Sequence, residues 1–234
     1  MPAYTSSQYA QRDRLALDYA AVHRVILPRC AAQVLSGGKP ITHALNRMTD
    51  DGDLCRYERC LPGGLTAYTL SPRAAARLGL SSDRADLPAG SVLDTAIAVQ
   101  VFCCLGPHLR YRLNSEESAS LFEGAVAPNV PLVLSNELGG TKAFRGVLAA
   151  NRPPGEVVRY VRTLISQAEQ HPKLSQWAVS RQLGFAVLTP NMPSREMVEK
   201  ALTKSQLSRH ASIIVGLGPD ADHLAASLKQ LDQK

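Results

Sequence analysis

The apolar residues of the first eighty positions change their spacing in a fixed order, and this order restricts the fold more than any other feature of the chain. The spacing is helical three times, then extended twice, and then helical again. The segments are residues 12–26, a shorter stretch after Pro28, and residues 40–48, 54–60, 65–70 and 73–78. Ser36-Gly37-Gly38 and Pro62-Gly63-Gly64 mark turns between them. The pattern predicts three helices, a β-hairpin and a fourth helix.

Each of the first three predicted helices has an apolar side that we expect to be buried. In the first helix this side consists of Leu15, Tyr19, Val22 and Ile26. In the second helix it consists of Ala31, Val34 and Leu35. In the third helix it consists of Ile41, Ala44, Leu45 and Met48. Ser71-Pro72 gives the fourth helix an N-cap followed by a proline at the first helical position, and Gly79 ends it.

This order of elements is that of a winged helix-turn-helix, in which the third helix enters the major groove of DNA and the hairpin contacts the backbone. The side chains that the third helix would present to the groove are Lys39, Thr42, His43, Asn46 and Arg47. Arginine and lysine pair with guanine or phosphate, and asparagine can make two hydrogen bonds to adenine. The hairpin residues expected to reach phosphates are Arg56, Tyr57 and Arg59.

The distribution of charge agrees with an N-terminal module that binds a polyanion. Residues 1–80 hold ten Lys or Arg against six Asp or Glu, which is +4 of the net charge of +6. Because a basic patch attracts nucleic acid, we expect double-stranded DNA as the partner. We also expect a homodimer, because one winged helix reads too short a site for useful specificity.

Composition excludes several other classes of protein. No stretch approaches the eighteen or so consecutive apolar residues of a membrane span, so we expect a soluble, cytoplasmic protein without a membrane partner. The five cysteines contain no C-x-x-C pair and the six histidines are scattered, which predicts reduced thiols and no metal site. We expect no cofactor.

A second domain is predicted after a linker. Residues 81–90 are rich in Ser, Asp, Gly and Pro, and they separate a domain of residues 1–80 from one of residues 91–234. In the second domain we expect helices over residues 91–105, 154–170, 194–207 and 220–231, and strands over residues 130–134, 185–188 and 212–215, with Tyr111 and Leu113 in a further strand. Strands that alternate with helices predict an α/β sheet that is at least partly parallel, in a chain that is α+β overall.

Several segments of the chain together point to a known family. They are residues 44–52, 67–71, 74–79, 94–101 and 184–190, Pro128-Asn129, and Glu137-Leu138 with Thr141. In these segments the chain resembles the replication-relaxation family of plasmids and other mobile elements. That family joins an N-terminal winged helix to a domain similar to restriction-endonuclease-like nucleases. The resemblance implies a DNA-binding protein that is regulatory or takes part in the replication of a mobile element.

The chain departs from the nuclease pattern that this resemblance implies. Such nucleases hold a magnesium ion with an acid on one strand and a second acid, followed two positions on by a lysine, on the next strand. Asn129 stands where the family tends to have aspartate, and Gly139 stands two positions after Glu137. Lys142 reaches the site only if the preceding glycine turn folds it back. We therefore expect a catalytically silent nuclease-like domain, kept for binding or dimerisation.

Two alternatives stay open from the residues alone. One is a magnesium-dependent endonuclease centred on Glu137, with Asn129 and Lys142 as further candidates and with Glu116 and Glu123 as substitute acids. The other is an adaptor whose winged helix binds a protein instead of DNA.

Overall fold

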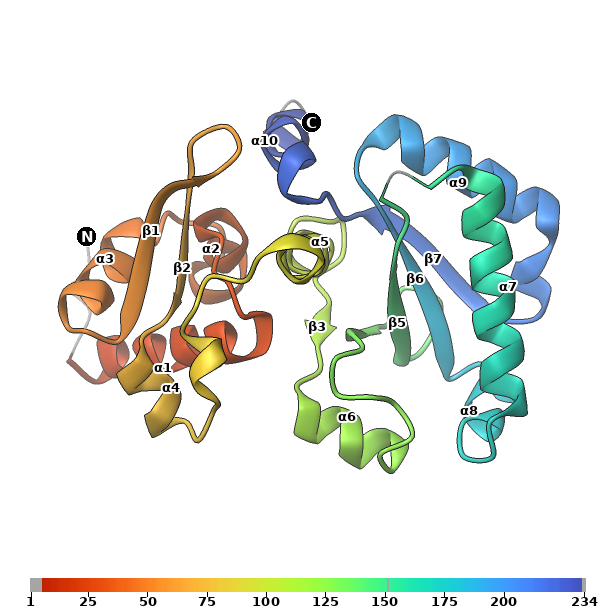
Figure 1. Cartoon of the computed structure of the whole chain (residues 1–234), viewed down its shortest axis with the longest axis horizontal. Helices are drawn as coiled ribbons and strands as arrows, with labels where there is room; N and C mark the ends of the chain where they lie inside the picture. Colours follow the sequence, from red (N-terminus) through yellow and green to blue (C-terminus); the bar gives the residue numbers. More distant parts are fainter. Residues whose placement is uncertain (1–5, 151, 233–234) are drawn as a thin grey trace. The chain divides into compact units, whose positions relative to one another are not determined.

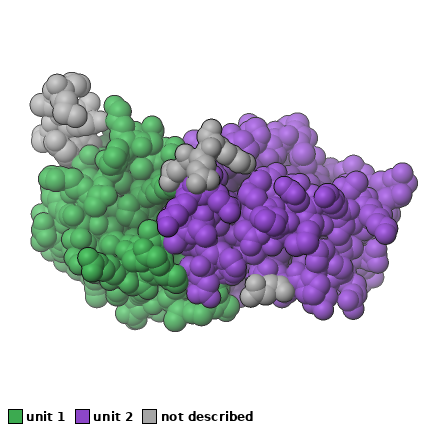
Figure 2. All heavy atoms as spheres, turned by 90° about the horizontal axis from the view of Figure 1, so that it is seen from above, with its two compact units in different colours: residues 1–100 green, residues 101–234 purple. Residues whose placement is uncertain are grey.

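The computed structural model describes residues 6–150 and 152–232. The chain divides into two compact units, residues 1–100 and residues 101–234, which we call unit 1 and unit 2 (Figure 2). The mixture of helices and strands agrees with the predicted α/β class. Within the described residues, no helix is both long enough and apolar enough to cross a membrane.

Unit 1 is built from helices and one hairpin (Figure 1). Its elements are α1 (Ser6–His23), α2 (Pro28–Ser36), α3 (Thr42–Asp50), β1 (Leu54–Leu61), β2 (Leu65–Leu70), α4 (Pro72–Arg77), the 3-10 helix η1 (Ser82–Arg84) and most of α5 (Gly90–Cys104). Strands β1 and β2 pair antiparallel, with Leu54 opposite Leu70. The predicted order of three helices, hairpin and helix is therefore confirmed. The predicted cap of α4 is also confirmed, because the Ser71 hydroxyl accepts a hydrogen bond from the Ala74 amide.

The buried sides of α1 and α2 differ from the prediction. Leu15 is 49% exposed and Val34 is 51% exposed, whereas Val22 and Leu35 are half-buried. Among the side chains that the structure describes, α1 buries Ala16, Leu17, Tyr19, Ala20 and His23, and α2 buries Cys30, Ala31 and Ala32. Small alanines let a helix backbone approach its neighbours closely, and this close packing outweighs the burial of one larger side chain. The helix ends before Ile26, which forms an extended bridge with Tyr68 of β2.

The segment predicted as a linker packs onto unit 1. Ala85 is buried, and its carbonyl oxygen accepts a hydrogen bond of 2.7 Å from the Thr69 hydroxyl of β2. Gln100 of α5 is also buried; its side-chain oxygen lies 2.8 Å from the Leu27 amide nitrogen, and its Nε2 donates to the Val25 carbonyl. The observed division therefore falls at residue 100, whereas the sequence predicted a linker at residues 81–90.

Unit 2 is a mixed sheet with helices. Its elements are the end of α5, then β3 (Tyr111–Arg112), α6 (Ser115–Phe122), β4 (Leu132–Ser135), β5 (Lys142–Leu148), α7 (Pro154–Gln170), α8 (Ser175–Val179), β6 (Leu183–Thr189), α9 (Met192–Ser205), the 3-10 helix η2 (Leu207–Arg209), β7 (Ser212–Leu217) and α10 (Ala221–Asp232). The strand order is β3-β4-β5-β6-β7. Strands β5, β6 and β7 are parallel, and β4 is antiparallel to both neighbours, which confirms the predicted partly parallel sheet.

The core of unit 2 lies mainly between the sheet and its helices. Helices α7 and α9 cover one face of the parallel strands (Figure 1). The side chains buried there include Val147, Val161, Val187 and Val198. A smaller cluster surrounds Phe122, whose ring centroid lies 5.3 Å from that of the half-buried Trp177.

Candidate nucleic-acid interface

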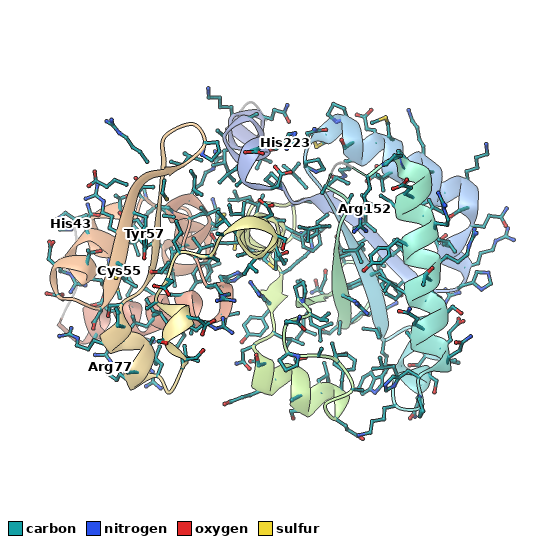
Figure 3. The ribbon with its side chains drawn as sticks, viewed as in Figure 1. His43, Cys55, Tyr57, Arg77, Arg152 and His223 are labelled. Atoms are coloured by element: carbon teal, nitrogen blue, oxygen red, sulfur yellow. The ribbon has the colours of Figure 1, made fainter. Side chains whose placement is uncertain are left out.

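Helix α3 buries its apolar side and exposes a polar one. Its predicted buried residues are at most 8% exposed; they are Ile41, Ala44, Leu45 and Met48. This leaves Thr42 and His43, at the N-terminal end of α3, exposed to solvent together with Lys39 in the preceding turn. His43 projects from the outer side of the helix (Figure 3). Three of the five predicted groove residues are therefore available on the surface of unit 1.

The other two predicted groove residues are engaged within unit 1. The Asn46 Oδ1 atom accepts a hydrogen bond of 2.7 Å from the Tyr68 hydroxyl. Burial raises the pKa of Tyr68, so this hydroxyl stays protonated and remains a donor. The Arg47 guanidinium lies between two carboxylates: its Nη2 is 2.6 Å from each oxygen of Asp13, and its Nη1 is 3.1 Å from Asp51 Oδ2. Both side chains thus have partners before any ligand binds.

The hairpin presents its basic residues in two different ways. Arg56 lies 3.2 Å from the Glu58 carboxylate, its neighbour on the same side of β1, and both side chains are exposed. Arg59 lies in a bulge where Glu58, Arg59 and Cys60 stand opposite Thr66 alone, and its backbone has φ of 49°. The half-buried Tyr57 donates from its hydroxyl to the Ala85 carbonyl at 3.4 Å, which ties the hairpin to η1.

Ion pairs take up much of the positive charge of unit 1. Asp53 lies 3.1 Å from Arg73 and 3.3 Å from Arg77, and Asp83 lies 2.9 Å from Arg24. Within the described part of the chain, Lys39 and Arg59 make no ion pair. Among the described residues, positive charge without an ion pair is therefore found before α3 and on the hairpin, and also at the exposed Arg14 of α1. Sequence reasoning missed the role of Asp13, because nothing in local spacing shows that a residue 34 positions away meets Arg47.

Glu137, the predicted second acid of a nuclease, lies between β4 and β5 and is held by arginine. Arg110 Nε is 3.0 Å from one carboxylate oxygen, and Arg110 Nη2 is 2.9 Å from the other. The Arg110 side chain is itself 4% exposed; it donates to the Phe102 carbonyl at 2.7 Å and lies over the Phe102 ring. Burial alone would raise the pKa of Glu137, but the hydrogen bonds and charge of Arg110, with the Ser135 hydroxyl, lower it below its ordinary value. Sequence reasoning did not identify Arg110.

The other predicted nuclease residues lie elsewhere in unit 2. Lys142 begins β5, and its Nζ lies 3.1 Å from the Ser212 hydroxyl of β7. Asn129 is exposed in the turn before β4. Glu116 is exposed in the first turn of α6, and Glu123 is exposed just after that helix. In residues 6–150 and 152–232, no three His, Cys, Asp or Glu side chains group as ligands for a metal ion. The structure therefore pairs Glu137 with Arg110 and Lys142 with Ser212.

Three comparisons with known proteins gave no relative: no protein-family model, no curated protein and no solved structure matches the chain.

Proposed function

We propose that residues 1–80 form a winged helix-turn-helix that binds double-stranded DNA. In this proposal α3 enters the major groove, and the β1–β2 hairpin lies along the backbone. The observation that carries the proposal is the division of α3 into a fully packed side and an exposed side with Thr42 and His43, which follow the exposed Lys39 of the preceding turn. The N-terminal residues of a recognition helix are those that contact base edges in such proteins, and these three residues lie at that end.

The contacts follow from the chemistry of the exposed side chains. Thr42 and His43 can donate to or accept from base edges, whereas Lys39 and Arg59 neutralise phosphates. Arg56 adds a phosphate contact if it exchanges the exposed Glu58 carboxylate for phosphate, and such exposed ion pairs are weak. The half-buried Tyr57 would position the hairpin.

The proposal also covers the rest of the chain. We assign unit 2 to a restriction-endonuclease-like fold without nuclease activity, kept for binding or homodimerisation. The bidentate pair of Arg110 with Glu137 supports this, because the guanidinium already neutralises the carboxylate that would hold a magnesium ion. The biological role would be regulation or replication of a mobile element, as the resemblance to the replication-relaxation family implies, and the chain would act in the cytoplasm.

The test is a fluorescence anisotropy titration of a labelled DNA duplex with the full chain at several salt concentrations. Lys39→Ala and Arg59→Ala should each weaken binding and reduce the slope of log K against log salt by about 0.9, the value for one lost phosphate contact. Thr42→Ala should weaken binding without changing that slope, because the hydroxyl that it removes carries no charge.

Matched controls come from unit 2. Lys204 of α9 and Arg162 of α7 are exposed, and Lys204→Ala and Arg162→Ala make the same chemical changes away from the proposed interface. They should bind like the parent protein. Equal losses in all these variants would show nonspecific attraction and count against the interface. No salt-dependent duplex binding by the parent protein would favour the adaptor alternative.

A further inference from the structure

The partner of Arg47 comes from a different helix. Asp13 belongs to α1, and both of its carboxylate oxygens lie 2.6 Å from Arg47 Nη2. The Arg47 side chain is 36% exposed and that of Asp13 is 21% exposed, so solvent only partly screens the pair. A charge-assisted hydrogen bond of this length is among the stronger interactions on a protein surface.

The second carboxylate beside Arg47 matters less. Asp51 lies four residues on, at the C-terminal end of α3, and its side chain is 53% exposed. Exposed pairs at this spacing on a helix contribute only a few tenths of a kcal/mol. Of these two carboxylates, Asp13 is therefore the one that more strongly keeps Arg47 from bonding a phosphate or a base edge.

We propose that Asp13 restrains Arg47 and thereby lowers the affinity of unit 1 for DNA. The inference rests on the proposed function, because it concerns the same exposed side of α3. In the free protein the Arg47 guanidinium already donates to the Asp13 carboxylate. A phosphate that replaces this carboxylate therefore adds little to the free energy of binding. Arg47 then contributes little to binding, although the sequence places it among the groove residues.

Removal of the Asp13 charge should release Arg47 for DNA. In the anisotropy titration with the full chain, Asp13→Asn should tighten binding about fivefold near physiological salt. The slope of log K against log salt should steepen by about 0.9, because one additional phosphate is neutralised. Far-UV circular dichroism of the variant establishes that the helices are retained.

A double-mutant cycle separates release of Arg47 from the general effect of removing a negative charge. Arg47→Gln should change the affinity of the parent protein less than twofold, but it should abolish the gain in the Asp13→Asn background. Asp18→Asn is the matched control: Asp18 is exposed on the same helix, and it makes no ion pair in the described part of the chain. Its gain should be less than half that of Asp13→Asn.

The possible outcomes distinguish this inference from the proposed function. Unchanged or weaker binding by Asp13→Asn, while the parent protein binds the duplex, overturns the inference alone. Weaker binding would mean that Asp13 holds Arg47 in its binding position. A gain that persists in the Arg47→Gln background also overturns it, because the charge alone would then account for the effect. If neither the parent protein nor Asp13→Asn binds duplex DNA, the proposed function and the inference both fail.

Discussion

Gly184 of β6 gives a sharp test of how tightly the sheet of unit 2 is packed. All seven residues of β6 are buried, and Gly184 stands between Phe144 of β5 and Ser212 of β7. A Cβ atom at this position would lie 2.5 Å from the Ser212 carbonyl oxygen and 2.7 Å from the Phe144 ring. Favourable contacts between heavy atoms begin near 3.5 Å, so Gly184→Ala forces the neighbours to move by about 1 Å.

The magnitude follows from two opposing effects. Overpacking of a well-filled core costs about 1–3 kcal/mol, and the upper end applies here because one of the obstructing atoms belongs to the paired backbone of β7. Alanine also has less backbone freedom than glycine in the unfolded chain, and this stabilises the folded state by about 0.4–1 kcal/mol. The net loss is about 2 kcal/mol of unfolding free energy, which is about thirtyfold in the equilibrium constant.

The assay is urea denaturation followed by the fluorescence of Trp177, the single tryptophan of the chain, which belongs to unit 2. The midpoint should fall for Gly184→Ala while the slope of unfolding free energy against urea stays constant. Gly155→Ala is the control, because an added Cβ meets nothing within 4 Å there and alanine favours a helix. Its midpoint should rise slightly. A midpoint for Gly184→Ala at or above that of the parent protein would refute the packing argument.

Two further predictions concern Glu137. Since the pKa of this carboxyl is lowered in the folded state, its ion pair stabilises unit 2 above the unfolded pKa near 4.5, and this stabilisation is lost as the pH falls below it. Urea midpoints measured from about pH 7 to pH 3 should therefore fall less steeply for Glu137→Gln than for the parent protein, and parallel curves would contradict the assigned ion pair. In the second experiment, the protein is incubated with supercoiled plasmid and Mg²⁺, and we expect no nicking above background. Cleavage that Glu137→Gln abolishes would restore the nuclease alternative.

Local pattern predicted the elements that are strongly periodic or bounded by turns. The apolar side of α3 is correct residue by residue, and the β1–β2 hairpin and α7 lie within about one residue of their predicted bounds. Helix α6 was missed although Asn114 and Glu117 form a capping box, a signal that the sequence does contain. Strand β5 was missed because Lys142, Arg145 and Gly146 interrupt its apolar character.

Local pattern did not predict the bonding partners of the candidate site residues. The sequence shows that Asn46 and Arg47 lie on the polar side of a helix, but it does not show that Tyr68 and Asp13 bond them. Arg110 and Glu137 are likewise 27 residues apart and meet only in the folded chain. Periodicity reports which side of an element faces the core, whereas the partner of a charged group depends on how separate elements pack.

The buried amide of Gln100 determines how the N-terminal unit can be studied in isolation. A fragment cut at residue 80 would lose the side chain that bonds the Leu27 amide and the Val25 carbonyl. Those two backbone groups, both in buried residues, would lack these bonds, and each unsatisfied group costs about 1–3 kcal/mol. A shortened protein meant to retain the proposed DNA-binding surface should therefore keep α5, at the C-terminal end of unit 1.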